Sequence, residues 1–139
     1  MHADATSSTR PRAPDVTVKR LADFESNHDF FFRARAGLGV TSFGMNVEKH
    51  PPRSEWHPEH DHVRDGQEEV YVPLDGSGTL YAGGEEFALE RGVFVRVGAG
   101  ERRRIVAGDE GLLLLCLGGV PGGVYEPPAF TNEGAPWTA

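Results

Sequence analysis

The sequence predicts an all-β domain built as an antiparallel sandwich or barrel. Glycine and proline are abundant, with 18 and 10 among 139 residues. No long stretch repeats apolar residues at the helical period, and short strand-like runs are separated by turn signals at regular intervals. A chain of this length supports one apolar core, so residues 16–139 are predicted to form a single domain. Residues 1–15 are rich in Ser, Thr, Pro and charge, which predicts a flexible tail.

The expected strands begin near the N-terminus. "VTVKRL" (16–21) alternates like a first edge strand. The segment up to the aromatic cluster at 30–32 is ambiguous, with a possible short helical turn, and the cluster itself is predicted to be core. The remaining strands are expected at "TSFGMNVEKH" (41–50), "HDHV" (60–63), "EEVYVPL" (68–74), "GTLYA" (78–82), "EEFALE" (85–90), "VFVRV" (93–97), "RRRIVA" (102–107) and "LLLLCLG" (112–118).

The segment from about residue 118 is too rich in Gly and Pro for a central strand. Val124, Tyr125, Phe130 and Trp137 give it apolar anchors. We therefore expect a C-terminal strap that crosses the barrel or covers its mouth.

Charge and composition restrict the partners and the compartment. The formal net charge of -7 argues against a nucleic-acid partner, since proteins that bind the phosphate backbone gather surplus Lys and Arg. No apolar run approaches the length that spans a bilayer, so no membrane partner is expected. The single cysteine, Cys116, can form no internal disulfide, which fits a reducing compartment. We expect a cytoplasmic protein.

Half of the six histidines lie between His57 and His62, just before a strand-like run. Residues two apart on a strand face the same way, so His60 and His62 are expected to project together. After the turn signal at Asp65-Gly66 the chain returns, and Glu69 can lie across from them. Two histidines and a carboxylate bind divalent transition metals and leave positions open for a substrate or dioxygen. Fe, Mn, Ni, Zn and Cu all accept this set, so the sequence does not distinguish the metal.

Three neighbouring residues complete the predicted site. Gln67 and Tyr71 share the face of Glu69 on the return strand and are expected to contact the substrate. His57 is a possible extra ligand.

The stretch resembles the first conserved motif of the cupin superfamily, G-x5-H-x-H-x(3 or 4)-E-x6-G. His60 and His62 match H-x-H, and Glu69 followed by Gly76 matches E-x6-G. Ser54 replaces the first glycine. The spacer between the second histidine and the glutamate is longer than usual, at a turn that can absorb it.

The second cupin motif, G-x5-P-x-G-x2-H-x3-N, aligns with Gly92 to Ala107. Gly92 and Gly100 match, whereas Gly98 and Ala107 stand at the proline and asparagine positions. Arg103 stands where the remaining histidine ligand of the family is expected. The resemblance runs from about residue 43 to residue 117 and implies a jelly-roll β-barrel, the double-stranded β-helix of cupins.

Arg103 leaves three interpretations open. In the first, the metal remains on the two histidines and Glu69, and Arg103 holds an anionic substrate. In the second, no metal is bound, and Arg103 pairs with Glu69 inside a pocket for a small carboxylate or phosphate. In the third, Arg103 turns outward, and Arg102 or Arg104 is buried instead.

The resemblance implies a small-molecule site inside the barrel. If the protein is an enzyme, it implies a metal-dependent dioxygenase or isomerase. The alternative is a non-catalytic, metal-free binding or sensing module in which Arg103 holds an anionic ligand. Val70, Val72 and Leu74 make the opposite face of the Glu69 strand apolar, so a homodimer is expected, unless the N-terminal segment covers its own barrel.

Overall fold

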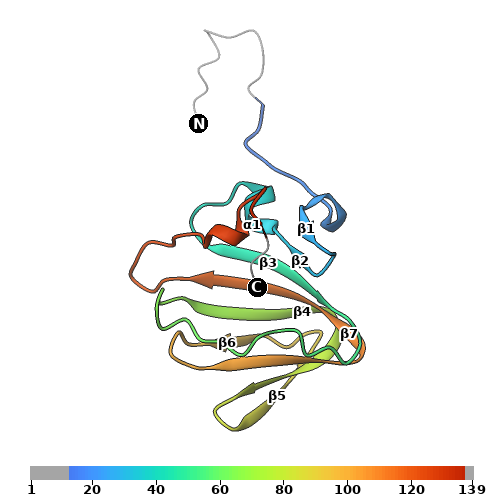
Figure 1. Ribbon diagram of the computed structural model, residues 1–139. Helices are drawn as coiled ribbons and strands as arrows, with labels where there is room; N and C mark the ends of the chain where they lie inside the picture. The colour runs from blue at the N-terminus through green and yellow to red at the C-terminus, as the bar shows by residue number, and fades with distance from the viewer. Residues whose placement is uncertain (1–12, 137–139) are drawn as a thin grey trace, which may run out of the picture.

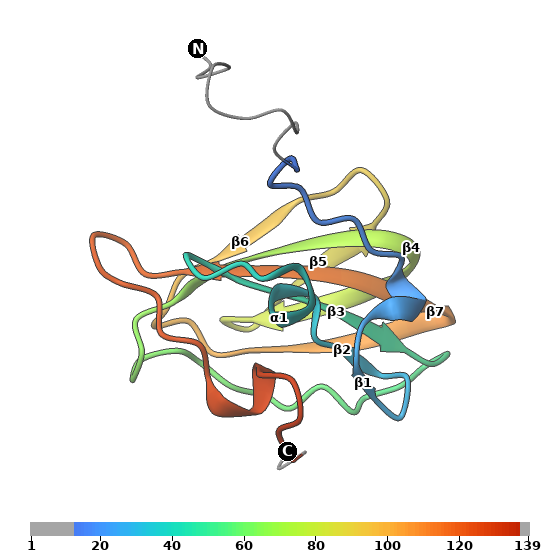
Figure 2. The same ribbon diagram turned by 90° about the horizontal axis from the view of Figure 1, so that it is seen from above.

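A computed structural model describes residues 13–136 (Figures 1 and 2). Most of the predicted tail and the expected anchor Trp137 lie outside the described residues. The described chain is mostly antiparallel β-sheet with little helix, which confirms the predicted all-β class. The strands are β1 (Ser26–Asn27), β2 (Phe31–Phe32), β3 (Gly44–His50), β4 (Glu68–Ala82), β5 (Glu85–Glu90), β6 (Val95–Val97) and β7 (Arg103–Gly119). The helical elements are η1 (Leu21–Asp23), α1 (Ala34–Leu38) and η2 (Ala129–Thr131).

Two long strands, β4 and β7, form the frame of the barrel. They pair antiparallel at both ends, and each replaces two strands that the sequence predicted separately. The register shifts between Pro73 and Asp75 and again between Gly76 and Gly78. Such bulges bend a strand, so the two halves of β4 can belong to different sides of the barrel. The first half also pairs with β6 and the second half with β5, while β3 pairs with the end of β7.

Gly76 shows why the glutamate motif ends in glycine. It has a φ of +74° at the bend of β4. A Cβ atom there would lie 2.1 Å from the carbonyl oxygen of Gly111 on β7. Only glycine permits both this backbone conformation and this close approach of the two strands.

The interior of the barrel is divided between an apolar core and a polar cavity. The core gathers inward side chains of β4 to β7, and its buried members are Tyr71, Leu80, Leu89, Val97, Ile105, Ala107, Leu112, Leu114 and Cys116. The inward face of β3 is different, because it carries Asn46, Glu48 and His50 at alternate positions. The apolar core therefore fixes the frame, and the polar residues collect next to β3.

The N-terminal segment covers the outer face of β3 and β7. Phe32 and Ala34 are buried there with Val47, and they pack against the outward side chains Leu113 and Leu115. Figure 1 shows β1, β2 and α1 beside β3. The chain thus covers part of its own outer surface, but this cluster of described residues does not include Val70, Val72 or Leu74, the apolar face that the sequence singled out, and Leu74 is 44% exposed. The homodimer remains a prediction.

Two strands expected from alternation are absent from the described chain. Residues 16–20 form no strand, and Val16 and Val18 are 70% and 84% exposed. Alternation alone does not make a strand when no sheet edge accepts it. At "HDHV" only His60 pairs, in an isolated bridge with Arg103. The carboxylate of Asp61 accepts a hydrogen bond from the backbone N–H of Val63 at 3.1 Å, which turns the chain away from a strand.

The C-terminal segment after β7 returns to α1. Arg33 donates from Nε to the carbonyl oxygen of Phe130 at 2.9 Å and from Nη2 to that of Ala135 at 2.8 Å. Arg35 donates from Nη2 to the side-chain oxygen of Asn132 at 2.6 Å. Residues 120–136, called the strap below, are thereby tied to α1 (Figure 2). In the described part of the chain no helix has the length and apolar character needed to cross a bilayer.

Candidate metal centre

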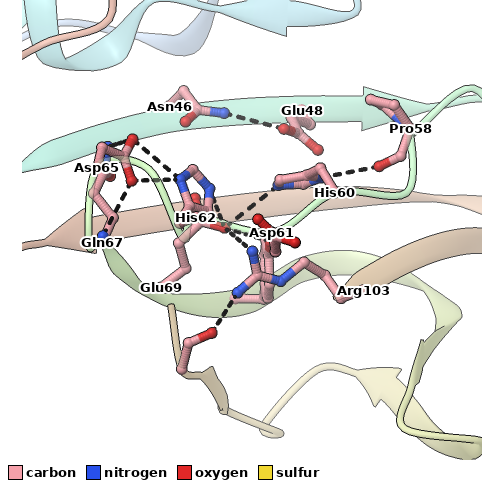
Figure 3. Close-up of polar contacts among 12 residues, drawn as sticks. Asn46, Glu48, Pro58, His60, Asp61, His62, Asp65, Gln67, Glu69 and Arg103 are labelled. Atoms are coloured by element: carbon pink, nitrogen blue, oxygen red, sulfur yellow. Dashed lines mark hydrogen bonds and ion pairs between the residues drawn. The ribbon is translucent and has the colours of Figure 1, made fainter. Parts of the chain in front are cut away.

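His60, His62 and Glu69 converge in the structure. One possible ligand atom from each lies within 4.8 Å of the others. Nε2 of His62 is 3.2 Å from Oε1 of Glu69, and Nε2 of His60 is 3.8 Å from the same oxygen. Figure 3 shows the two imidazoles and the carboxylate pointing toward one another. The predicted ligand set is therefore brought together, although the histidines lie on a loop with one isolated bridge at His60 and not on the expected strand.

The Nδ1 atom of His60 and that of His62 each have a hydrogen-bond partner close by in the sequence. Nδ1 of His60 lies 2.9 Å from the carbonyl oxygen of Pro58, and a carbonyl can only accept, so this nitrogen carries the proton. Nδ1 of His62 lies 3.0 Å from a carboxylate oxygen of Asp65. In the neutral imidazoles both Nε2 lone pairs then face Glu69. Hydrogen-bond acceptors at Nδ1 orient metal-binding histidines in this way.

The long spacer of the glutamate motif supplies Asp65. Besides His62, this carboxylate accepts hydrogen bonds from the backbone N–H and the side-chain amide of Gln67, at 3.1 and 2.9 Å. Gly66, with a φ of +74°, completes the turn that the sequence predicted. The extra residues therefore hold the second histidine in place.

Glu69 is ionised in this setting. Burial acts to raise the pKa of its carboxyl, but interactions with His60 and His62 and the hydrogen bond from Tyr71 together hold the pKa far below its usual value. The hydroxyl of Tyr71 donates to Oε1 at 2.6 Å. Burial and the nearby Glu69 charge raise the pKa of Tyr71, so this hydroxyl keeps its proton. In the metal-free protein the two carboxylates beside His62 outweigh its partial burial and raise its pKa.

Arg103 lies behind Glu69, fully buried. Its Nη1 is 3.6 Å from Oε1 of Glu69, and its Nη2 donates to the carbonyl oxygen of Gly98 at 3.0 Å. Within residues 13–136, its Nε and Nη1 have no hydrogen-bond partner. The side chains of Arg102 and Arg104 are 60% and 41% exposed. The interpretation that turned Arg103 outward is therefore wrong.

The cavity lies on the open side of the three converging residues and has a volume of about 500 Å³. Gln67 and His57 line it, whereas Tyr71 and Arg103 are outside the described lining, behind Glu69. The ring centroid of His57 is 5.1 Å from that of His60, but His57 is outside the group of three converging ligands in the described chain. Burial lowers the pKa of His57 to about 4, so it is neutral at pH 7.

The wall facing these ligands was missed in the sequence. Glu48 and Asn46 of β3 line the cavity, and His50 is buried next to Glu48. Trp56 stacks on His50 at 4.7 Å between ring centroids. The strap closes another side with Tyr125, Pro128, Phe130 and Thr131. The only local signal was the alternation Asn46, Glu48 and His50, which also fits a solvent-exposed face.

A divalent transition metal fits the three converging residues. Among the described groups, Nε2 of His62 is buried and has no hydrogen-bond partner, because its contact with Glu69 lacks the alignment of a hydrogen bond. Two lone pairs and an ionised carboxylate around one point are the donor set of a cation. His60, His62 and Glu69 would hold such a metal. Its identity is not distinguished by these ligands.

Solved structures identify the fold. A cupin protein from Bacteroides fragilis superposes with a TM-score of 0.62 at 20% identity, over 87% of this chain and all of that one. A predicted oxalate decarboxylase from Thermotoga maritima gives 0.61 at 20% identity, over 75% and 99% of the two chains. A sugar phosphate isomerase of the cupin superfamily from Silicibacter pomeroyi gives 0.59 at 21%, over 70% and 59%.

The chain therefore has the cupin fold, a jelly-roll β-barrel, which confirms the fold that the sequence motif implied. No protein-family model and no curated protein sequence matches this chain.

Proposed function

We propose that the protein is a metal-dependent cupin enzyme that acts on a small molecule in the barrel cavity. Its divalent transition metal is held by His60, His62 and Glu69. The observation that carries the proposal is the orientation of both histidines, whose Nδ1–H groups donate hydrogen bonds to Pro58 and Asp65 so that Nε2 faces Glu69. A metal in this position would polarise a substrate oxygen or bind dioxygen.

The residues around the cavity support a reaction on a small organic molecule. A volume of about 500 Å³ is ordinary for a small-ligand site. Aromatic side chains from β2, the loop before His57 and the strap form the apolar part of the lining, and they are Phe31, Trp56, Tyr125 and Phe130. They would exclude water and hold the body of the ligand. The solved neighbours include a protein titled as a sugar phosphate isomerase and one titled as a predicted oxalate decarboxylase, which supports a reaction on a small organic molecule.

The test is elemental analysis of the purified protein beside His60→Ala and Glu69→Ala variants. We expect close to one transition metal per wild-type chain and its loss in both variants, since each removes one of three ligands. His28→Asn is the matched control, because His28 is exposed on a turn with a positive φ that Asn tolerates. A wild type that stays metal-free after reconstitution with Fe, Mn, Ni and Zn would contradict the proposal.

One observation favours the metal-free binding module as a second candidate. Arg103 already gives Glu69 a buried positive partner. In that case small carboxylates should raise the melting temperature of the metal-free wild type but not that of Arg103→Ala. Because Arg103 is outside the described cavity lining, the ligand would have to reach it past Glu69.

A further inference from the structure

Glu48 is an ionisable group in the cavity that the metal site does not use. It projects inward from β3, opposite Leu114 of β7, and its side chain is 12% exposed. Figure 3 shows Glu48 projecting from β3 toward His60 and His62. The ring centroid of His57 is 5.1 Å from that of His60 and 6.0 Å from that of His50. Glu48 and the three converging residues line one cavity.

His50 holds this carboxylate in a fixed position. Its Nε2 lies 2.9 Å from Oε1 of Glu48, which makes Nε2–H the donor. Stacking on Trp56 fixes the plane of the imidazole. The side-chain amide of Asn46 donates to the other carboxylate oxygen at a longer distance, 3.3 Å. An oriented carboxylate with one weakly used oxygen can accept a proton from a ligand.

The groups facing Glu48 leave it negatively charged. These groups are His50 and Asn46 on β3, Cys116 on β7, His57 on the loop between β3 and β4, and Glu69 on β4. Burial acts to raise the pKa of Glu48, but the hydrogen bond from His50 and the nearby imidazoles bring the net pKa below its usual value. Burial raises the pKa of the Cys116 thiol, so this neighbour stays neutral.

We propose that Glu48, positioned by His50, is the proton acceptor for an α-hydroxycarbonyl substrate of this site. The inference rests on the proposed function, because the ligand must present an oxygen to the metal and a proton to Glu48. A hydroxyl-bearing carbon beside a carbonyl offers both, because the carbonyl oxygen can face the metal and the adjacent C–H bond carries an acidic proton. Such a compound also matches the mixed polar and aromatic lining of the cavity.

The step is a proton transfer without net oxidation. The carboxylate of Glu48 takes the proton from the hydroxyl-bearing carbon. The C–H electron pair becomes the new carbon–carbon double bond, and the carbonyl electrons move to the carbonyl oxygen. Glu48 then returns the proton to the former carbonyl carbon, the hydroxyl proton moves to the former carbonyl oxygen, and the hydroxyl-bearing carbon becomes the new carbonyl. The substrate is thereby isomerised, and in D2O the returned hydrogen is deuterium.

The experiment follows deuterium exchange into dihydroxyacetone, an uncharged α-hydroxyketone, by proton NMR. The metal-loaded wild type should exchange faster than the same metal without protein. Glu48→Gln should lower that rate about 100-fold, in the range typical of a lost general base. Glu48→Asp should recover part of it. Glu68→Gln is the matched control, since Glu68 lies on the outer face of β4 and pairs with the exposed Arg96.

His50 has its own readout as a positioning residue. His50→Leu removes the hydrogen bond that favours the ionised carboxylate, so the acid limb of the exchange rate should move to higher pH. A purely structural role would lower the rate without moving that limb.

Metal content and circular dichroism of the same samples separate the two proposals. A metal-free wild type would overturn the proposed function. A loaded and folded Glu48→Gln variant that exchanges at the wild-type rate would overturn only the role of Glu48. A loaded wild type that exchanges no faster than free metal would overturn the substrate class and that role together.

Discussion

The two polar walls of the cavity are held in different ways. The ligand wall, made of His60, His62 and Glu69, is oriented by residues close in sequence, because Pro58 and Asp65 accept hydrogen bonds from the imidazole Nδ1–H groups. The β3 wall, made of Asn46, Glu48 and His50, also has local hydrogen bonds to Glu48, but it faces the cavity only because β3 pairs with β7. It lies beside a strap that Arg33 and Arg35 hold from 97 positions away in sequence. The local wall carries a recognisable motif, whereas the other wall exists only once the chain has folded.

The sharpest test of the ligand wall is Arg103→Met. Removing one partner of a buried ion pair costs about 3 kcal/mol, so the metal-free variant should be less stable to urea by that amount. Loss of a cation near the site should also tighten divalent-metal binding about tenfold, measured by competition with a chelator. Arg102→Met, at an exposed neighbour, is the control. Unchanged stability together with unchanged metal affinity would show that Arg103 is not coupled to Glu69.

The burial of His57, whose ring lies near both His60 and His50, is tested by His57→Phe. The folded pKa of His57 is about 4 and the ordinary value is 6.5, so below pH 6.5 the unfolded chain takes up a proton that the folded chain does not. Stability should therefore fall between pH 6.5 and 4, by about 3 kcal/mol at most from this group.

The variant should lose that part of the decline. Urea unfolding of both chelator-treated proteins across this pH range measures it, with His28→Asn as the control. Parallel pH profiles for wild type and His57→Phe would contradict a buried neutral His57.

The strap side is tested by Arg33→Ala. This variant removes two charge-assisted hydrogen bonds to strap carbonyls and the ion pair with Glu25, so stability should fall by about 2 kcal/mol or more and protease cleavage within residues 120–136 should increase. Metal content should not change, because Arg33 contacts no ligand. Exposed Arg91→Ala should show neither effect. Metal loss in Arg33→Ala would mean that the two sides are not independent.

The smallest effect is expected for Asp65→Ala. It removes the acceptor that orients His62, which should weaken metal binding about tenfold. Stability should change little, because the Asp65 side chain is partly exposed. Asp109→Ala, at an exposed position within β7, is the comparison in the same chelator assay. Equal affinities for the two variants would show that Asp65 does not orient the ligand.

The sequence predicted the fold class and the three converging residues because both depend on short local sequence patterns. Turn signals mark the barrel, and the histidine and glutamate spacing marks the ligands. The β3 wall was not predictable in the same way. Alternation showed that Asn46, Glu48 and His50 share a face, but not that this polar face points inward, which depends on the pairing of β3 with β7.

The same limit explains the wrong strand prediction at Val16 and Val18. The pattern alternates there, but no sheet edge pairs with these residues. It also explains why the sequence did not predict that Arg103 is buried and Arg102 exposed. The apolar neighbours on the strand did not show which arginine faces inward. Both outcomes depend on contacts between distant parts of the chain.

The central claim is that one metal lies between His60, His62 and Glu69. An anomalous difference map from crystals of the metal-loaded protein tests it directly. The expected result is a single strong peak about 2.0–2.2 Å from Nε2 of both histidines and from a Glu69 carboxylate oxygen. A map with no peak between these three side chains, or with metal bound only elsewhere, would contradict the account.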